Sequence, residues 1–319
     1  MRLIVTIPAY NEEKTIAKVI HSIPRQVGDM DEVLILVVDD GSTDNTAAVS
    51  KEAGADFVLS HQNVGLATNF RISQDEALKR GADIILNIDA DNQYDASEIP
   101  KLLEPILKDE ADIVSGDRQV KTLDHMASSK KYGNMLGTWV VKKVSGLPIK
   151  DASSGFRAYS REAALRLNVI SQHTYTHETI IQAANKNLRF VEVPVAFRRT
   201  ERDGNESRLI GGVWGHVKKS GATIVRTYST YRSLKTFFFI GLPFFLIGLF
   251  FILRFLYFYF FDSGVGHIQS LIIAAILVIV GFQVFIIGLV ADGINANRKI
   301  NEEILYRLKK KEYSQKEGE

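Results

Sequence analysis

Cysteine is absent from this chain of 319 residues, which excludes disulfides, thiolate metal sites and a cysteine nucleophile. A dominant charge is absent as well: 39 basic residues face 37 acidic ones, and the net charge of +2 gives no overall field that favours nucleic acid as a partner. No charged-then-apolar signal segment precedes the strand-like residues that follow Met1. Together these absences favour a protein that works at a cytosolic face.

Long apolar runs are missing before residue 235 and present after it. Thr236 to Phe261 and Ile268 to Ala291 are each long enough to cross a hydrocarbon core of about 30 Å. The link 262–267 contains no Lys or Arg, whereas both flanks are rich in them. By the positive-inside rule, this pattern predicts a two-span hairpin in the cell membrane with both ends cytoplasmic. The alternative is a hairpin buried in a protein core.

Residues 1 to about 207 alternate between strand-like and helix-like segments. Strands are expected at 3–7, 33–38, 57–59, 84–88, 113–115 and 190–195. Helices are expected at 12–22, 44–54 and 69–80. This alternation predicts an α/β fold in which helices cover both faces of a mostly parallel sheet.

Acidic and polar side chains follow three of these strands. They are Tyr10 and Glu12 after 3–7, Asp39 after 33–38, and Asp89, Asp91 and Gln93 after 84–88. The carboxyl ends of parallel strands share one edge of a sheet, where ligands bind in open α/β folds. Carboxylate and amide oxygens suit Mg²⁺ or Mn²⁺, which complete their shells with phosphate oxygens of a ligand. An Asp-x-Asp triplet also occurs in solvated turns, so the triplet alone is weak evidence.

The parts of a sugar nucleotide match these side chains. Asp39 would accept hydrogen bonds from the base or ribose, and Tyr10 and Glu12 would line the base. A metal at the Asp-x-Asp triplet would bridge the diphosphate and stabilise it as a leaving group. Three arginines are candidates for phosphate binding through their planar guanidinium groups: Arg118, Arg202 and Arg208.

Residues 198–235 are strongly basic, since nine Lys and Arg residues minus three acidic ones leave a charge of +6. Apolar residues at helical spacing, from Ile210 to Val217, predict an amphipathic helix on the bilayer surface. A solvated loop that obeys the positive-inside rule is an equal alternative. The predicted organisation is a catalytic domain at 1–207, a basic amphipathic juxtamembrane segment at 208–235, two transmembrane helices within 236–291, and a cytosolic tail at 292–319.

An ordered set of motifs runs through the first 210 residues. They are Pro8-Ala9-Tyr10-Asn11-Glu12, Asp39-Asp40-Gly41-Ser42-Thr43-Asp44, Asp89-Ala90-Asp91-Asn92-Gln93, Asp151 to Tyr159 with Ser154-Gly155-Phe156 at its centre, Glu178, and Val193-Pro194-Val195 leading to Ser207-Arg208-Leu209. In this order, the set resembles family-2 glycosyltransferases of the dolichol-phosphate mannose synthase and polyprenyl-phosphate glucosyltransferase kind. The two-span C-terminal anchor is also similar to that of the polyprenyl-phosphate enzymes, some of which form tetramers, so a homo-oligomer is expected.

This resemblance implies a GT-A type, Rossmann-like fold and a UDP- or GDP-sugar donor. It implies Mg²⁺ or Mn²⁺ at Asp89, Asp91 and Gln93, donor contacts at Pro8, Tyr10, Glu12, Val37, Asp39 and Ala90, phosphate contacts at Arg118, Arg202 and Arg208, and an acceptor-side role for Glu178. One departure concerns the last motif. Relatives usually show Arg-x-x-Gly-x-Ser-Lys where this chain reads Arg202-Asp203-Gly204-Asn205-Glu206-Ser207-Arg208, so either Arg199 or Arg202 fills the arginine role.

The acceptor implied by the resemblance is a dolichyl or undecaprenyl phosphate. Such a phosphate is already anionic near neutral pH, so its oxygen attacks the anomeric carbon without a strong base, and in-line attack inverts that carbon. A transferase acting on a hydroxyl needs a base, for which Glu178 and Asp151 are the candidates. A processive polysaccharide synthase usually carries Gln-x-x-Arg-Trp, which this chain lacks. A membrane-tethered scaffold is the third alternative, and the intact acidic clusters argue against it.

Overall fold

The computed structural model describes residues 1–28, 30–124, 126, 128–171, 174–199, 233–261 and 268–315. Its contacts divide the chain into two compact units. Unit 1 comprises Met1–Val225 together with Glu303–Glu319, and unit 2 comprises Arg226–Glu302. The four-part organisation expected from the sequence stays a prediction, because most of its juxtamembrane segment lies outside the described residues.

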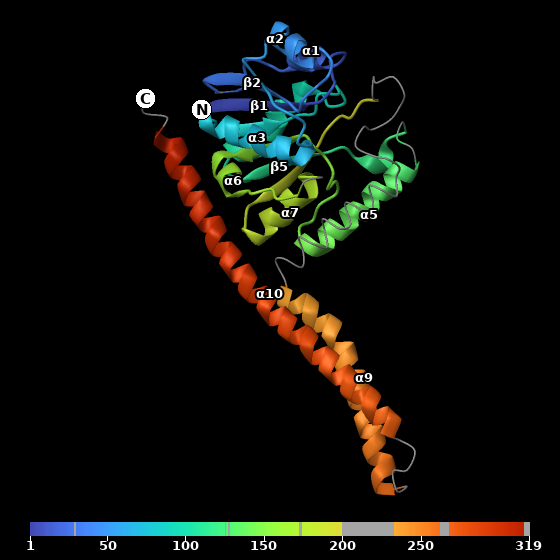
Figure 1. Ribbon diagram of the computed structural model, residues 1–319. Helices are drawn as coiled ribbons and strands as arrows, with labels where there is room; N and C mark the ends of the chain where they lie inside the picture. The colour runs from blue at the N-terminus through green and yellow to red at the C-terminus, as the bar shows by residue number, and fades with distance from the viewer. Residues whose placement is uncertain are drawn as a thin grey trace. The chain divides into compact units, whose positions relative to one another are not determined.

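Within the described residues, unit 1 holds one seven-stranded sheet in the order β3-β2-β1-β4-β6-β5-β7. Figure 1 shows β1 and β2 side by side in this sheet. The strands are β1 (Arg2–Ala9), β2 (Glu32–Asp39), β3 (Phe57–Ser60), β4 (Ile84–Asn87), β5 (Ile113–Asp117), β6 (Arg157–Ser160) and β7 (Phe190–Pro194). Neighbouring strands are parallel except where β6 pairs with β4 and β5. The mostly parallel α/β fold is thus confirmed. The sequence pattern does not predict β6, because turn-forming residues crowd the segment that leads into it.

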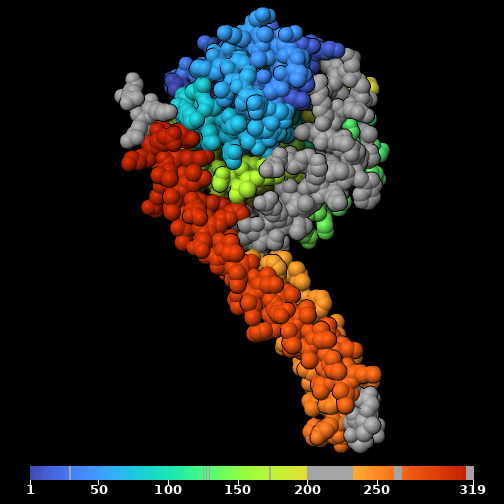
Figure 2. Space-filling model, viewed as in Figure 1, coloured from blue at the N-terminus to red at the C-terminus, as the bar shows by residue number. Residues whose placement is uncertain are grey.

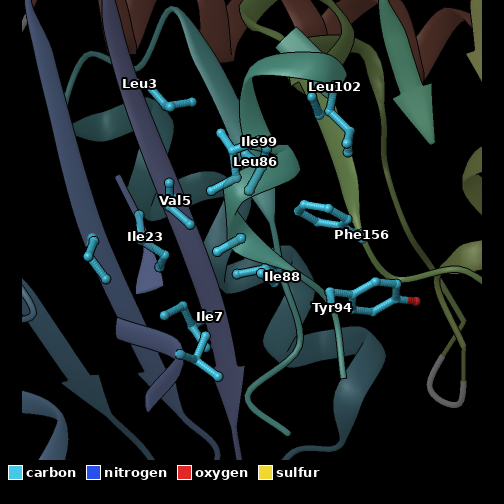
Figure 3. Close-up of a cluster of buried hydrophobic side chains, with 14 of the residues drawn as sticks. Leu3, Val5, Ile7, Ile23, Leu86, Ile88, Tyr94, Ile99, Leu102 and Phe156 are labelled. Carbon is cyan, nitrogen blue, oxygen red and sulfur yellow. The ribbon is translucent and has the colours of Figure 1, made fainter. Parts of the chain in front are cut away.

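One face of the sheet is covered by α1 (Ile16–Ser22), α2 (Thr46–Glu52) and α4 (Ile99–Leu107). Leu3, Val5 and Ile7 of β1 point to this face, at the two-residue spacing of a strand. They belong to the same buried cluster as Ile23, directly after α1, and Leu102 of α4 (Figure 3). The cluster includes residues of β1, β2 and β4, the strands that end in the acidic motifs, so its packing fixes the positions of those motifs.

The other face is covered by α3 (Leu66–Lys79), α6 (Arg161–Arg166) and α7 (Thr176–Asn185). Ile4, Leu36 and Ile85 of the central strands point to this face and are fully buried. Phe70 of α3 stacks on Tyr175, with ring centroids 3.9 Å apart. Helices therefore cover both faces, as the alternating pattern predicts.

Unit 2 is built from α9 (Ser233–Phe261) and the first part of α10 (Ile268–Gln315). Both helices are long and apolar enough to cross a membrane, and they contain the two expected spans. A Cβ added to Gly241 would lie 2.8 Å from the ring of Phe285, and one added to Gly248 would lie 2.8 Å from Val278. Small residues thus allow the close packing of α9 on α10, whose atoms lie against each other in Figure 2.

Arg254 is an exposed residue of α9. Its guanidinium carbon lies 5.4 Å from the centroid of the Phe258 ring, one helical turn further along the same helix. A cation over an aromatic face offsets part of the cost of a charge within an apolar helix.

The end of α10 belongs to unit 1 and adds to its second face. Tyr313 is buried in the cluster beneath α3 and α6. The hydroxyl of Tyr306 donates to the Glu162 carboxylate at 2.9 Å, and the Lys309 ammonium donates to Asp75 at 2.6 Å. These final residues are therefore a packed part of unit 1 and not a detached tail.

The strand ends that carry the acidic motifs meet at one edge of the sheet. Ala9 at the end of β1 is aligned with Asp39 at the end of β2, and β4 runs parallel beside β1. β5 points the same way, because β6 is antiparallel to both β4 and β5. We call the loops after β1, β2 and β4 the β2 side of this edge. The loop after β5, the loop 151–156 that enters β6, and the start of α7 form the β5 side.

Candidate active site

On the β2 side, the loops after β1 and β2 hold each other in place. Asn11 adopts a left-handed φ of 53°, and its side-chain oxygen accepts a hydrogen bond from the Thr43 N–H at 2.7 Å. The Asn11 N–H donates to the Ser42 hydroxyl at 2.8 Å. Ser42 in turn donates to Asp39 Oδ1 through its N–H at 3.1 Å and through its hydroxyl. The Asp39 carboxylate is thus oriented by both loops.

Asp40 fastens a third loop to the same frame. Its Oδ1 accepts from the Val64 N–H at 2.7 Å, and its Oδ2 accepts from the Gly65 N–H at 3.0 Å. Gly41 has a φ of 72°, and a Cβ there would lie 2.7 Å from the Asn63 nitrogen, so this position requires glycine. Of the two adjacent aspartates, Asp40 therefore serves the loop structure, while Asp39 is the last residue of β2, aligned with Ala9 of β1.

The other predicted donor-binding residues lie around this frame at different depths. Tyr10 is 39% exposed, whereas Glu12 is only 6% exposed. Pro8 is buried at the end of β1, and Val37 and Ala90 belong to the hydrophobic cluster of the first sheet face. The fold thus brings these residues together on the β2 side. Which of them touches a nucleotide stays a prediction.

The Asp-x-Asp motif forms a tight turn after β4. Asn92 has a left-handed φ of 59°, and Asp91 Oδ1 accepts from the Gln93 N–H at 3.2 Å. The Gln93 side-chain amide donates to the Arg198 carbonyl at 3.4 Å. Among the described residues, no group of three or more His, Cys, Asp or Glu side chains could hold a metal ion. Two carboxylates and an amide oxygen in one turn are donors of the kind that Mg²⁺ or Mn²⁺ takes, with phosphates and water as further ligands, so this donor set fits such an ion.

The Asp89 carboxylate lies against the backbone of Gly155, which comes from the β5 side. A Cβ on Gly155 would stand 2.7 and 2.8 Å from the two carboxylate oxygens. The Asn87 side-chain amide donates to the Gly155 carbonyl at 2.9 Å, and the Gly155 N–H donates to the Tyr94 hydroxyl at 3.2 Å. Burial raises the pKa of Tyr94 to about 12, so the hydroxyl stays protonated. The Ser-Gly-Phe motif therefore positions Asp89.

Arg118, directly after β5, forms a two-point ion pair with Asp151. Its Nε donates to Oδ2 at 2.6 Å and its Nη2 to Oδ1 at 2.9 Å, while Nη2 also donates to the Ser153 hydroxyl at 2.8 Å. Burial alone would raise the pKa of the Asp151 carboxyl, but the charge and hydrogen bonds of Arg118 outweigh it, and the pKa is lowered. Asp151 is thus ionised, and both of its carboxylate oxygens accept hydrogen bonds from Arg118. The phosphate-binding role of Arg118 stays a prediction.

Glu178 lies in the first turn of α7 and is 3% exposed. Its Oε1 accepts from the Ile170 N–H at 3.1 Å, and its Oε2 accepts from the Ser171 N–H at 2.9 Å. The Gln182 amide adds a third hydrogen bond to Oε1 at 3.0 Å. Both oxygens therefore hold the loop that precedes α7, and the predicted acceptor-side role of Glu178 stays a prediction.

The sequence pattern does not identify Arg157 as part of the site. Its guanidinium is fully buried and donates to Ser115 Oγ at 3.1 Å and to Thr179 Oγ1 at 2.8 Å. It also donates to the carbonyls of Thr176 at 2.8 Å and Ala152 at 3.0 Å. One side chain thus joins β5, the loop 151–156 and α7. An arginine between apolar neighbours, directly after the Ser-Gly-Phe motif, is the signal that could have revealed it.

The remaining predicted site residues, Arg202 and Arg208, lie outside the described residues, as does the basic segment around them. The choice between Arg199 and Arg202 for the family arginine role likewise stays open. The described part of the edge therefore contains the predicted metal-binding turn, the donor-side frame and one of the three predicted phosphate-binding arginines.

Known proteins resemble this chain in sequence and in fold. Residues 4–167 match the model of the family described as glycosyl transferase family 2. The UDP-N-acetylglucosamine–dolichyl-phosphate N-acetylglucosaminyltransferase of Methanococcus voltae is 31% identical over 220 residues, covering 61% of this chain and 85% of that protein. The undecaprenyl-phosphate mannosyltransferase of Micrococcus luteus is 29% identical over 232 residues, covering 68% and 91%.

A solved structure shares the fold of this chain. It is glucosyl-3-phosphoglycerate synthase from Mycobacterium tuberculosis, crystallised with Mn²⁺, UDP-glucose and phosphoglyceric acid. The two superpose with a TM-score of 0.55 at 22% identity, covering 72% of this chain and 79% of that one. At this identity, the likeness concerns the fold alone.

Proposed function

The chain belongs to glycosyl transferase family 2, and on that premise we propose that it moves one sugar from a nucleotide-sugar donor to a polyprenyl phosphate, with inversion at the anomeric carbon. Relatives named for dolichyl-phosphate and undecaprenyl-phosphate acceptors support this choice of substrate class. The proposal also includes a UDP- or GDP-sugar donor and Mg²⁺ or Mn²⁺.

The observation that carries the acceptor assignment is the state of the two candidate bases. Asp151 is paired at both oxygens with Arg118, and its pKa is lowered, so it is a weak proton acceptor. Both carboxylate oxygens of Glu178 already accept hydrogen bonds from backbone N–H groups. A hydroxyl acceptor needs a base to remove its proton, whereas a phosphate oxygen is anionic near pH 7. The arrangement therefore favours a phosphate as the nucleophile.

The donor would bind along the β2 side. Asp39, oriented by Ser42, would accept from the base or ribose, with Tyr10 and Glu12 close by. Asp89 and Asp91, with Gln93, would hold the divalent ion, which when bound neutralises charge on the diphosphate and makes it a better leaving group. Gly155 and Tyr94 help to hold this corner, because a Cβ on residue 155 would clash with the Asp89 carboxylate and the Tyr94 hydroxyl accepts from the Gly155 N–H.

The reaction needs only positioning and charge neutralisation from the chain. A non-bridging oxygen of the polyprenyl phosphate attacks the anomeric carbon, a new carbon–oxygen bond forms, and the bond to the nucleoside diphosphate breaks. The electron pair leaves with the diphosphate, so no proton transfer is required. Arg118 would neutralise phosphate charge by dividing its donors between Asp151 and the substrate, together with Arg202 and Arg208.

The membrane hairpin would keep the enzyme beside its lipid acceptor. We propose that the spans within α9 and α10 cross the cell membrane with unit 1 on the cytoplasmic side, since sugar nucleotides are cytoplasmic metabolites and the flanks of both helices are basic. Tags at the two ends should be accessible from the same side of sealed vesicles. Accessibility from opposite sides would contradict this topology.

The deciding experiment compares two acceptors that differ by one group. The purified chain in proteoliposomes receives a panel of labelled sugar nucleotides with either a polyprenyl phosphate or the corresponding polyprenol. We expect one nucleotide sugar to label the lipid phase, only with the phosphate and only when Mg²⁺ or Mn²⁺ is present. Label in the polyprenol would refute the phosphate acceptor, and growth of a polymer would refute the transfer of a single sugar. Full turnover with excess chelator would refute the metal requirement.

A further inference from the structure

A short stretch of chain directly after β7 connects the two sides of the sheet edge. The Val195 N–H donates to the carbonyl of Asp117, at the end of β5, at 2.9 Å. The Arg198 N–H donates to the carbonyl of Gln93, in the Asp-x-Asp turn, at 2.7 Å. This backbone therefore runs from the end of β5 to the turn after β4, and Phe197 lies between its two attachments.

The Phe197 ring contacts both an aromatic ring of that turn and a cation of the β5 side. Its centroid lies 5.2 Å from that of Tyr94, in an edge-to-face arrangement, and 5.1 Å from the guanidinium carbon of Arg118. Tyr94 is buried and also packs beside Phe156, with ring centroids 5.1 Å apart (Figure 3). The neighbour that Phe197 has on the turn is therefore itself held in place.

The hydrogen bonds of Arg118 leave one of its nitrogens for a ligand. Nε and Nη2 donate to Asp151, and Nη2 also donates to Ser153. Among the groups that the structure describes, none accepts a hydrogen bond from Nη1. The side chain keeps 12% of its surface exposed, so a phosphate oxygen, the usual acceptor for a guanidinium edge, could reach it. The ion pair holds two of the nitrogens, and the Phe197 ring restrains the group in a further direction.

We propose that Phe197 is a positioning residue, whose ring holds the Arg118 guanidinium so that Nη1 meets the phosphate of the acceptor, and whose backbone joins this arginine to the Asp-x-Asp turn. The inference rests on the proposed function, because the phosphate is that of the polyprenyl acceptor. In this role Phe197 acts through Arg118 and touches no reacting atom. Its loss should therefore raise the KM for the acceptor and leave kcat nearly unchanged.

A purely structural role is the alternative, since Phe197 also packs against the buried cluster of the first sheet face. The two roles differ in how they respond to the charge distribution of the ring. Ring fluorines withdraw electrons from the aromatic face and weaken its attraction for a cation, while the ring keeps its shape and its apolar character. A series of fluorinated phenylalanines at position 197 therefore separates the holding of a cation from packing.

The first experiment places phenylalanine with one, two or three ring fluorines at position 197 of the full chain and measures sugar transfer in proteoliposomes. We expect the KM for the polyprenyl phosphate to rise with each fluorine, to about fivefold for three. The KM for the sugar nucleotide should not change. A KM for the acceptor that does not follow the number of fluorines would overturn the positioning role, and so would a rise confined to the KM for the sugar nucleotide.

Natural side chains give a second test with a matched control. Phe197→Leu removes the ring and should raise the KM for the polyprenyl phosphate about fivefold, whereas Phe197→Tyr keeps the aromatic face and should keep the KM. Phe57→Leu is the control, because Phe57 lies at the start of β3, away from the edge, and its ring centroid is 4.6 Å from the guanidinium carbon of Arg80. The control should change neither KM. Equal rises in Phe57→Leu and Phe197→Leu would overturn the proposal.

A third measurement needs no turnover. Phe197→Leu is compared by chemical denaturation in the unmodified chain and in Arg118→Met/Asp151→Leu, which lacks both buried charges. We expect Phe197→Leu to change the unfolding equilibrium constant about fivefold more in the unmodified chain, because only there does the ring face a cation. Equal changes would overturn the positioning role. If the chain transferred no sugar to a polyprenyl phosphate, the proposed function would fall, and this comparison would still decide whether Phe197 holds Arg118.

Discussion

The two sides of the sheet edge are held together in different ways. On the β2 side, turns formed by consecutive residues bind one another through backbone groups, as Asn11 does with Thr43 and Asp40 with Gly65. On the β5 side, charged side chains are buried and are satisfied by other side chains, as Arg118 is by Asp151 and Arg157 by Thr179. The first side is a set of frames held through the backbone, and the second is a network of side chains.

Because of this difference, substitutions on the two sides should differ in whether they affect only substrate binding and activity or also the stability of the fold. A carboxylate in a local frame can be altered while the frame survives, because most of its hydrogen bonds run through the backbone. A charge in a buried network cannot be altered alone, since its partner is then left unpaired away from water. Substitutions on the β2 side should therefore affect activity, whereas those on the β5 side should affect activity and folding together.

The largest effect is expected for the buried ion pair. Arg118→Met or Asp151→Leu leaves one buried charge without its partner and should lower the free energy of unfolding by about 3–5 kcal/mol, with loss of transfer. The double variant removes both charges and should recover most of the stability but none of the activity. Chemical denaturation of the full chain in detergent, together with the transfer assay, measures both. Single variants as stable as the unmodified chain would contradict the comparison.

On the β2 side, Asp91→Asn should reduce kcat/KM by about a hundredfold or more, the usual cost of losing a group that stabilises charge in the transition state. Its unfolding midpoint should not change. Asp95→Asn is the matched control in the same loop. Asp95 accepts from the Ser97 N–H at 3.0 Å and caps the 3₁₀ helix η1 (Ala96–Glu98), and asparagine is an equally good cap, so this variant should change stability by less than about 1 kcal/mol and leave turnover intact. If Asp91→Asn kept its activity and Asp95→Asn lost it, the metal-binding role would lie elsewhere in the loop.

The boundary between the two sides can be tested at Gly155. An alanine there would push its Cβ against the Asp89 carboxylate, so Gly155→Ala should weaken Mn²⁺ binding and destabilise the fold by about 1–3 kcal/mol. Gly133, in the first half of α5 (Ser128–Ser145), has nothing within 4 Å of an added Cβ. Gly133→Ala should therefore raise stability by up to about 1 kcal/mol. Calorimetric titration with Mn²⁺ and UDP checks the first effect, and unchanged affinity would show that Asp89 tolerates the displacement.

The smallest effect concerns pH. The pKa of the Asp151 carboxyl is lowered from its ordinary 3.8, so its contribution to stability is present above pH 3.8 and is lost as the pH falls through the lowered value. The stability gap between the unmodified chain and Asp151→Asn should be constant at neutral pH and close in acid. Burial raises the pKa of Glu192, so the gap for Glu192→Gln should have the opposite dependence, favouring the unmodified chain most below pH 4.5. Denaturation curves across pH 3–7 that showed parallel trends would contradict this assignment.

The same contrast explains what the sequence could predict. β1, β2 and β4 are apolar runs that end in short acidic motifs, so the strands and the grouping of Asp39 with Asp89 follow from local pattern. β6 begins with Arg157, whose burial makes sense only once Ser115 and Thr179 are beside it, and no local pattern supplies them. α5 escapes notice because its apolar residues face outward among lysines, the reverse of a helix that packs on a core.

The place of the hairpin in chain order has a consequence for membrane topology. Unit 1 is made of two pieces of chain, one before the spans and one after them, and the second piece is held by Lys309 to Asp75 and by Tyr306 to Glu162. Two pieces that touch must lie in the same compartment. These contacts therefore agree with the proposed hairpin, in which α9 and α10 both cross the bilayer. They disagree with an arrangement in which only one of the two helices spans, because that would put the two pieces on opposite sides.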